Sequence, residues 1–88
     1  MITIDNLTFY KTCDVCPEQY EVRDENDKEV GYVRLRWGYL RVDYPCCGGE
    51  TIYDADMDNG WAGCFMSEKE RMEHLTKIAR AIRERMNQ

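Results

Sequence analysis

Cysteines are the residues of this chain with the clearest capacity for chemistry. Cys13 and Cys16 form a C-x-x-C pair, which can supply two thiolates to one metal ion from a single tight turn. Zinc requires four ligands, so a second C-x-x-C pair would be needed. The later segment YPCCGG has Cys47 at the second cysteine position of such a pair but Tyr44 at the first. Cys13, Cys16 and Cys47 are therefore the candidate zinc ligands.

The cysteine count allows a second interpretation. The chain has five cysteines, and an odd number argues against a closed set of disulfides. Its first residues, MITID, lack the basic and hydrophobic regions of a secretory signal. We therefore expect a cytoplasmic location, where disulfides do not persist. The cysteines are expected to be either small free thiols or zinc ligands, with Cys64 or His74 completing the four.

Arginines and tyrosines alternate with apolar residues in the middle of the chain. The set is Tyr32, Arg34, Arg36, Tyr39 and Arg41, and Glu21 and Arg23 are expected beside it. Interleaved arginines and aromatic rings can grip phosphates and stack bases, as single-strand nucleic-acid binders do. The same residue types are enriched in protein–protein hot spots. These five residues are the candidate binding site, and a third interpretation, an ordinary hydrated sheet surface, stays open.

The net charge of the chain indicates which class of partner it could bind. The chain has 12 basic and 17 acidic residues, which give a net charge of −5. Nucleic-acid binding depends on neutralising phosphates, so an acidic chain favours a protein partner over nucleic acid. No apolar run is long enough to span a membrane, and we expect no membrane partner.

Candidates for catalysis are few. The sequence has one histidine, His74, and lacks a glycine-rich phosphate loop, a G-x-S-x-G elbow and an H-E-x-x-H motif. General acid–base or nucleophilic catalysis needs several reactive groups brought together. We therefore expect a protein that is not an enzyme, and assign no catalytic residue.

The C-terminal segment predicts an amphipathic helix over about residues 67–86. Ser67 and Glu70 have the spacing of a capping box. Acidic residues in the first turn and basic residues in the last suit the helix dipole. Apolar residues recur at helical spacing and form one stripe, which comprises Met72, Leu75, Ile78, Ala79, Ile82 and Met86.

The middle of the chain predicts a β-hairpin. Residues 30–37 and 39–44 alternate between apolar and polar, and Trp37 and Gly38 can form a two-residue turn between them. This turn places Arg34 opposite Arg41, a like-charge pair that costs stability and would attract an external anion. It also aligns the apolar residues on one face: Val33, Leu35, Leu40 and Val42. Further strands are expected at residues 19–24 and, with weaker alternation, near 7–11 and 51–54.

These elements predict a single small α+β domain over residues 1–88. An antiparallel meander of four to five strands within residues 1–56 would pack one face against the helix, as a two-layer sandwich. The leading hypothesis is a small non-enzymatic interaction or regulatory protein that docks on a macromolecular partner through the Tyr/Arg face. The alternative is a zinc-stabilised domain that binds nucleic acid with the same face.

Overall fold

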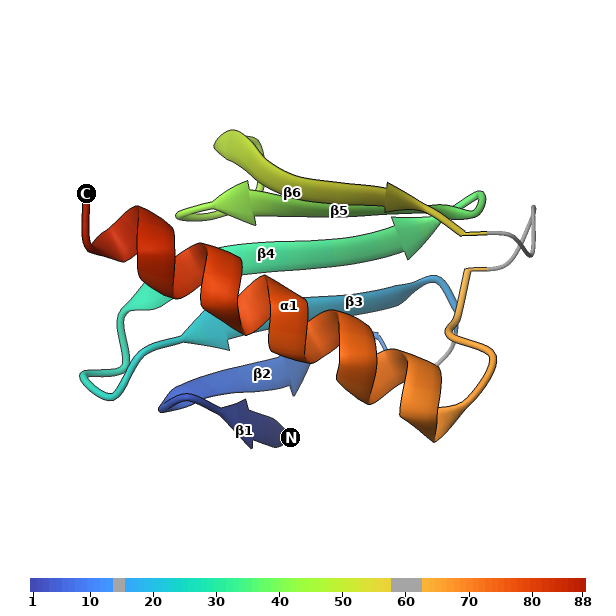
Figure 1. Ribbon diagram of the computed structural model, residues 1–88, viewed down its shortest axis with the longest axis horizontal. Coiled ribbons are helices and arrows are strands. Elements are labelled where there is room, and N and C mark those ends of the chain that lie inside the picture. The colour runs from blue at the N-terminus through green and yellow to red at the C-terminus, as the bar shows by residue number, and fades with distance from the viewer. Residues whose placement is uncertain (14–15, 58–62) are drawn as a thin grey trace.

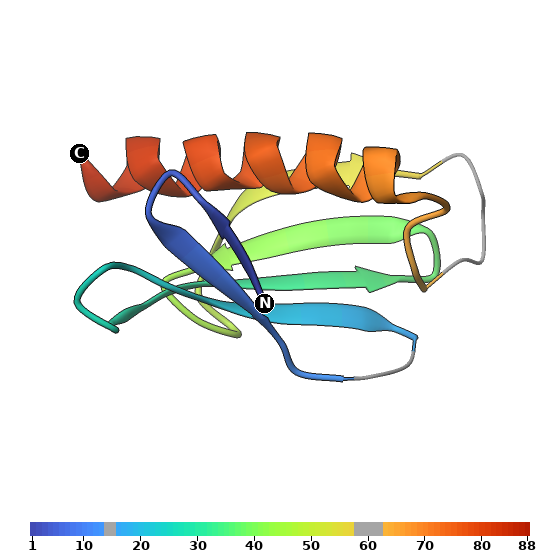
Figure 2. The ribbon, with the colours of Figure 1, turned by 90° about the horizontal axis from the view of Figure 1, so that it is seen from below.

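The fold is a six-stranded antiparallel sheet with one helix packed across one face (Figures 1 and 2). The computed structural model describes residues 1–13, 16–57 and 63–88. The strands lie in the sheet in chain order, so each pairs with its neighbours in sequence. The elements are β1 (Ile2–Ile4), β2 (Leu7–Lys11), β3 (Glu18–Arg23), β4 (Glu29–Arg36), β5 (Tyr39–Tyr44), β6 (Glu50–Asp56) and α1 (Glu68–Met86).

The predicted α+β class and two-layer arrangement are confirmed, and the strand count is six instead of four to five. The additional strand is β1, whose three residues pair with β2. A segment this short gives no measurable alternation, because two periods of a strand need at least four residues. The turn that joins β1 to β2 is Asp5–Asn6, where both residues have positive φ angles, of 53° and 62°.

The β4–β5 hairpin has the predicted register. Arg36 pairs with Tyr39 and Arg34 pairs with Arg41 across the two strands. Trp37 and Gly38 form the turn, with φ angles of 56° and 73°. Positive φ at both central positions is the pattern of a type I′ turn, whose twist matches that of the flanking strands.

The core lies between the sheet and the helix. Leu75, Ile78 and Ile82 of α1 are fully buried against apolar residues that the strands direct to the same side. Gly31 of β4 allows the close approach, because a Cβ atom there would lie 2.8 Å from Ile82 Cδ1. The buried hydrophobic residues of the strands are Leu7, Phe9, Tyr20, Val22, Val30, Val33, Leu35, Leu40 and Val42.

The helix begins at the predicted cap. Ser67 Oγ accepts a hydrogen bond of 3.1 Å from the Glu70 N–H. The Glu70 carboxylate accepts a second bond, of 2.9 Å, from the N–H of Met66, one residue before the cap. This arrangement pairs two backbone donors at the start of α1 that would otherwise lack partners.

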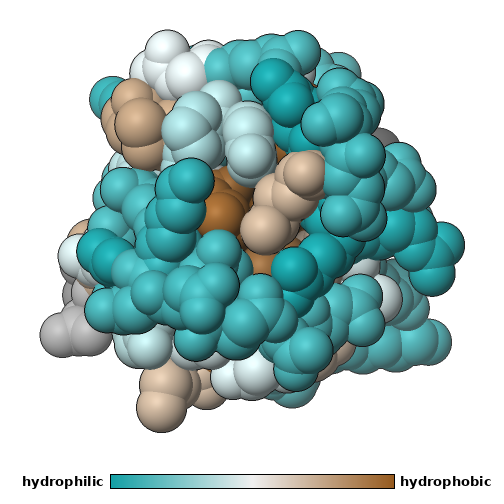
Figure 3. All heavy atoms as spheres, turned by 90° about the vertical axis from the view of Figure 1, so that its left-hand side faces the viewer, coloured by the Kyte–Doolittle hydropathy of each residue, from teal (hydrophilic) through white to brown (hydrophobic). Residues whose placement is uncertain are grey.

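At its C-terminal end, α1 contacts the sheet through an ion pair and a cation–π contact. Arg85 Nε lies 2.8 Å from Glu50 Oε1, and the Arg85 guanidinium lies 4.8 Å from the centroid of the Tyr44 ring. Figure 3 shows that this end of the molecule is mostly hydrophilic, with a few hydrophobic atoms visible in a small hollow. No helix in the described part of the chain is both long and apolar enough to cross a membrane.

Candidate functional site

The sheet surface opposite α1, here named the open face, carries the predicted Tyr/Arg residues. Successive side chains of a strand point to opposite sides, and Val33, Leu35, Leu40 and Val42 point into the core. The residues between them therefore lie on the open face, which is uncovered in Figure 2. This side carries all five members of the predicted set: Tyr32, Arg34, Arg36, Tyr39 and Arg41.

Four of these five residues surround one shallow hollow, here named the arginine hollow. Its volume is about 450 Å³, and it is lined by Arg34, Arg36, Trp37, Tyr39 and Arg41. Tyr32 lies farther along β4, where it pairs with Asp43. The hollow therefore sits at the end of the open face nearest the β4–β5 turn.

The arginine hollow has more positive charge than its own surroundings neutralise. Arg41 Nε lies 3.4 Å from Asp43 Oδ1. Among the described residues, Arg34 and Arg36 have no carboxylate within ion-pair distance. Like charges directly opposite on neighbouring strands are destabilising, and a bound anion would relieve the Arg34–Arg41 repulsion.

A row of carboxylates borders the arginine hollow on the β6 side. Asp54 pairs with Arg41, and Asp56 pairs with Tyr39, and both aspartates are exposed. The Tyr39 hydroxyl donates a 2.7 Å hydrogen bond to Asp54 Oδ2. This bond, with a smaller contribution from burial, raises the pKa of Tyr39. The open face therefore presents a basic patch beside an acidic strip.

Trp37 belongs to the hollow, although the sequence pattern predicts only its place in the turn. The residue is 65 % exposed, and the Arg36 guanidinium lies 5.9 Å from its ring centroid. The signal that could have identified it is a bulky residue in a type I′ turn, where asparagine or glycine is preferred.

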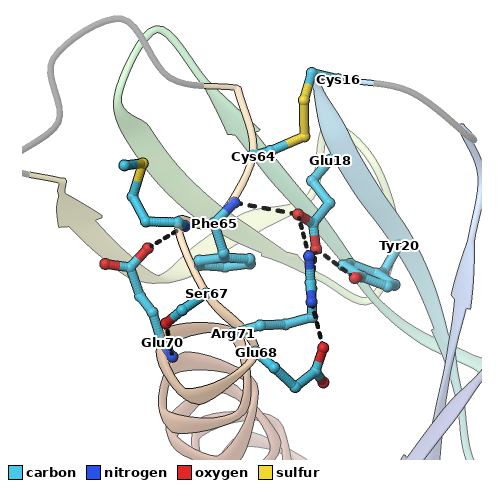
Figure 4. A network of polar contacts seen from close by, with 10 residues as sticks. Cys16, Glu18, Tyr20, Cys64, Phe65, Ser67, Glu68, Glu70 and Arg71 are labelled. Atoms are coloured by element: carbon cyan, nitrogen blue, oxygen red, sulfur yellow. Dashed lines mark hydrogen bonds and ion pairs between the residues drawn. A yellow bond between two sulfur atoms is a disulfide. The ribbon is translucent and has the colours of Figure 1, made fainter.

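A second polar cluster, which the sequence did not predict, joins β3 to the start of α1 (Figure 4). The Glu18 carboxylate is fully buried and accepts four hydrogen bonds. The donors are the Tyr20 hydroxyl, the Phe65 backbone N–H at 3.1 Å, and Arg71 Nε and Nη2 at 2.7 and 3.2 Å. Every lone pair is satisfied within the fold, so the cluster is structural.

The surroundings of this cluster favour the ionised forms of Glu18 and Arg71. Burial acts to raise the pKa of Glu18, but hydrogen bonds from Arg71, Tyr20 and Phe65 outweigh it and the pKa is lowered. The hydrogen bond to Glu18 raises the pKa of Arg71. Burial, together with the bond to Glu18, raises the pKa of Tyr20. Glu18 is therefore ionised and Tyr20 protonated at neutral pH.

The expectation that the cysteines would be free thiols or zinc ligands is wrong for two of them. Cys16 and Cys64 form a disulfide, with Cα atoms 5.5 Å apart. It lies beside the Glu18 cluster, where the loop before β3 meets the loop before α1 (Figure 4). Cys13, Cys46 and Cys47 are free.

The predicted zinc set of Cys13, Cys16 and Cys47 is not brought together. Cys13 and Cys16 lie near the start of β3, where Glu18 pairs with Leu35. Cys47 lies in the β5–β6 turn at the other end of the sheet, and Cys16 is already bonded to Cys64. In residues 1–13, 16–57 and 63–88, no three His, Cys, Asp or Glu side chains could hold one metal ion.

His74 occupies the flank of the helix, as its spacing predicts. Its ring stacks on Phe65, with centroids 5.7 Å apart and planes 19° apart. The Nδ1 atom lies 3.4 Å from the Tyr53 hydroxyl. These contacts place the imidazole in packing between the helix and the sheet.

The chain has no significant match among protein-family models, curated proteins or solved structures.

Proposed function

We propose that this chain is a small non-enzymatic interaction protein that docks through its open face on an acidic region of a partner protein. The observation that carries the proposal is the charge of the arginine hollow. Arg34 and Arg36 have no counter-charge among the described residues, yet they lie beside Arg41 and an exposed Trp37. Arg, Trp and Tyr are the residue types that dominate binding hot spots.

The acidic strip beside the hollow favours a protein over nucleic acid. A nucleic-acid backbone carries a continuous row of phosphates, which would extend from the hollow over Asp54 and Asp56. A protein surface can instead place carboxylates over the hollow and basic side chains over the strip. The net charge of −5 further disfavours a polyanion.

The size of the open face also suits a protein partner. The molecule measures 34 by 23 Å in the plane of the sheet, which is an area of about 800 Å². A standard protein–protein interface buries about 800 Å² on each partner. The outline of the sheet is therefore of the same order as one side of a standard interface.

A peptide-display selection tests this proposal, because a random library needs no partner to be identified beforehand. The wild-type chain would select from a library of short random peptides, in parallel with an Arg34→Glu/Arg41→Glu double variant. The matched control is Lys69→Glu/Lys77→Glu, which reverses the same charge on the outer side of α1, away from the sheet. Circular dichroism would establish that all three proteins are folded.

We expect the wild type and the helix control to enrich peptides rich in Asp and Glu, and the open-face variant to lose this enrichment. Enrichment that survives Arg34→Glu/Arg41→Glu would overturn the proposal. So would a wild-type selection that enriches no acidic peptides, or binding of a single-stranded oligonucleotide as tight as that of the selected peptides.

A further inference from the structure

We propose that the arginine hollow receives one phosphoryl group, carried by a phosphorylated serine or threonine of the docking partner. The inference rests on the proposed function and specifies the acidic group that the partner presents. The guanidinium groups that would hold the phosphoryl group belong to Arg34, Arg36 and Arg41, which line the hollow. Docking would then depend on whether the partner is phosphorylated.

Arg34 is the one half-buried arginine of the described residues whose charge the fold leaves unpaired. The other five half-buried arginines each form an ion pair with a carboxylate. They are Arg23, Arg41, Arg71, Arg83 and Arg85. The Arg34 side chain has neither an ion pair nor a hydrogen bond with any described residue. Because water compensates a half-buried charge incompletely, an unpaired one is costly, and an anion from a partner would complete the site.

Two more arginines project from the open face beside Arg34. Arg41 lies directly opposite on β5, at a Cα separation of about 4.5–5.5 Å for such a pair. Arg36 lies two residues farther along β4, about 7 Å away at the spacing of a strand. Arginine side chains are long and flexible enough to converge on one anion from these positions. Asp43 neutralises Arg41, so the surplus in the hollow is the charge of Arg34 and Arg36.

A phosphoryl group matches this surplus better than a carboxylate does. Phosphoserine carries a charge of about −1.5 to −2 at pH 7 and presents three acceptor oxygens. One such group would therefore neutralise both Arg34 and Arg36, and the planar guanidinium forks suit its oxygens. A carboxylate carries a single charge. Two carboxylates would have to enter the same hollow of about 450 Å³, where they would repel each other.

The shape of the surface favours phosphoserine or phosphothreonine over phosphotyrosine. The arginine hollow is shallow and lies on the open face of the sheet. A short side chain keeps its phosphate close to the partner's backbone, as a shallow site requires, whereas phosphotyrosine extends by a whole ring. The backbone beside the phosphorylated residue would then lie over Asp54 and Asp56, where basic side chains of the partner would pair with them.

Four peptide libraries with the same random flanks test this inference. Their fixed central residue is serine, glutamate, phosphoserine or phosphotyrosine. Each is offered to the wild type, to Arg34→Gln/Arg36→Gln and to the matched control Lys69→Gln/Lys77→Gln. The control removes the same number of positive charges from the outer side of α1. Circular dichroism would establish that all three proteins are folded.

We expect the wild type and the helix control to bind phosphoserine peptides about tenfold or more tightly than glutamate peptides with the same flanks. In Arg34→Gln/Arg36→Gln this preference should fall to about twofold or less, because the two unpaired charges are gone. Serine peptides should bind more weakly than either acidic form. The ratio between the two acidic forms is the decisive readout, since a general loss of surface charge would weaken both.

The outcomes distinguish this inference from the proposed function. Equal binding of phosphoserine and glutamate peptides would overturn the phosphoryl site and leave docking on an acidic region standing. A phosphoserine preference that survives Arg34→Gln/Arg36→Gln would place the phosphate elsewhere and overturn the inference, as would tighter binding of phosphotyrosine. If the wild type binds no acidic library, the inference and the proposed function are both wrong.

Discussion

Arg71 of helix α1 donates two hydrogen bonds to the buried carboxylate of Glu18, from Nε at 2.7 Å and from Nη2 at 3.2 Å. The two residues are 53 positions apart in sequence, and no other ion pair of the described residues involves a fully buried carboxylate. With the neighbouring Cys16–Cys64 disulfide, this pair fixes the start of the helix on β3 (Figure 4). The start of α1 is therefore held by polar and covalent contacts, in addition to the apolar packing of Leu75, Ile78 and Ile82 farther along the helix.

Replacing Arg71 with Met should strongly destabilise the fold. The substitution leaves the Glu18 carboxylate buried without its cation, and breaking a buried pair in this way costs about 3 kcal/mol or more. Urea denaturation would measure the free energy of unfolding. Arg80→Met, at an exposed position of the same helix, is the matched control and should change it by about 0.5 kcal/mol or less. Equal effects of the two substitutions would show that the buried pair contributes nothing.

The same pair predicts how stability responds to acid. The pKa of Glu18 in the folded state lies below its ordinary value of 4.5. Its ionisation therefore stabilises the fold above that ordinary value, and this contribution is lost as the pH falls through the lower folded-state pKa. Urea denaturation of the wild type and Glu18→Gln would show it. We expect the gap in unfolding free energy to shrink between neutral pH and about pH 3. A gap that stays constant would contradict the assignment.

The hairpin and its exposed side chains were predictable because both depend on local pattern. Alternation along β4 and β5 fixed which residues face the core, and the two-residue turn fixed the pairing of Arg34 with Arg41. A shift of the β4–β5 pairing by one residue would bury the arginines, so the shifted pairing is disfavoured. The side of the sheet that holds the candidate site follows from the same alternation.

The Glu18 cluster and the disulfide depend on contacts that local pattern does not encode. Glu18, Tyr20 and Val22 have strand spacing, but a strand that begins at residue 19 leaves Glu18 out of the core. Its partner Arg71 and the Cys16–Cys64 bond become visible only once the helix is docked on β3. Trp37 differs from these, because its turn is predictable from the sequence but the exposure of its ring beside the arginines depends on the folded hairpin.

The Cys16–Cys64 disulfide should contribute much of the stability of the chain. It links residues 48 positions apart, and a closed loop of that size is worth about 4 kcal/mol in the chain-entropy treatment. Cys64→Ser should therefore lower the free energy of unfolding by about 2–4 kcal/mol, whereas Cys46→Ser, at an exposed free thiol, should leave it nearly unchanged.

A thiol count checks the disulfide directly. The unfolded chain should show three reactive thiols before reduction, from Cys13, Cys46 and Cys47. It should show five after reduction. Five thiols in the protein as isolated would mean that the bond does not form where the chain is made.

A small anion should stabilise the free protein by binding between Arg34 and Arg41. Inorganic phosphate serves as the probe, because binding to the folded state alone raises the Tm by mass action. We expect a larger rise in phosphate than in sodium chloride of equal ionic strength, in the wild type and in Arg80→Gln. The additional rise should be smaller in Arg34→Gln, because this substitution removes half of the cross-strand pair.

The comparison between the two glutamine variants decides the cause of any stabilisation. Phosphate also stabilises proteins generally, by exclusion from their surfaces, and that effect would be the same in every variant. An equal rise in Arg34→Gln and Arg80→Gln would therefore assign the effect to exclusion and leave the hollow without an anion. At low salt without phosphate, Arg34→Gln should be no less stable than the wild type, because it removes the repulsion from Arg41. A marked loss of stability would instead mean that the Arg34 side chain supports the sheet, and that its positive charge is not held there for a partner.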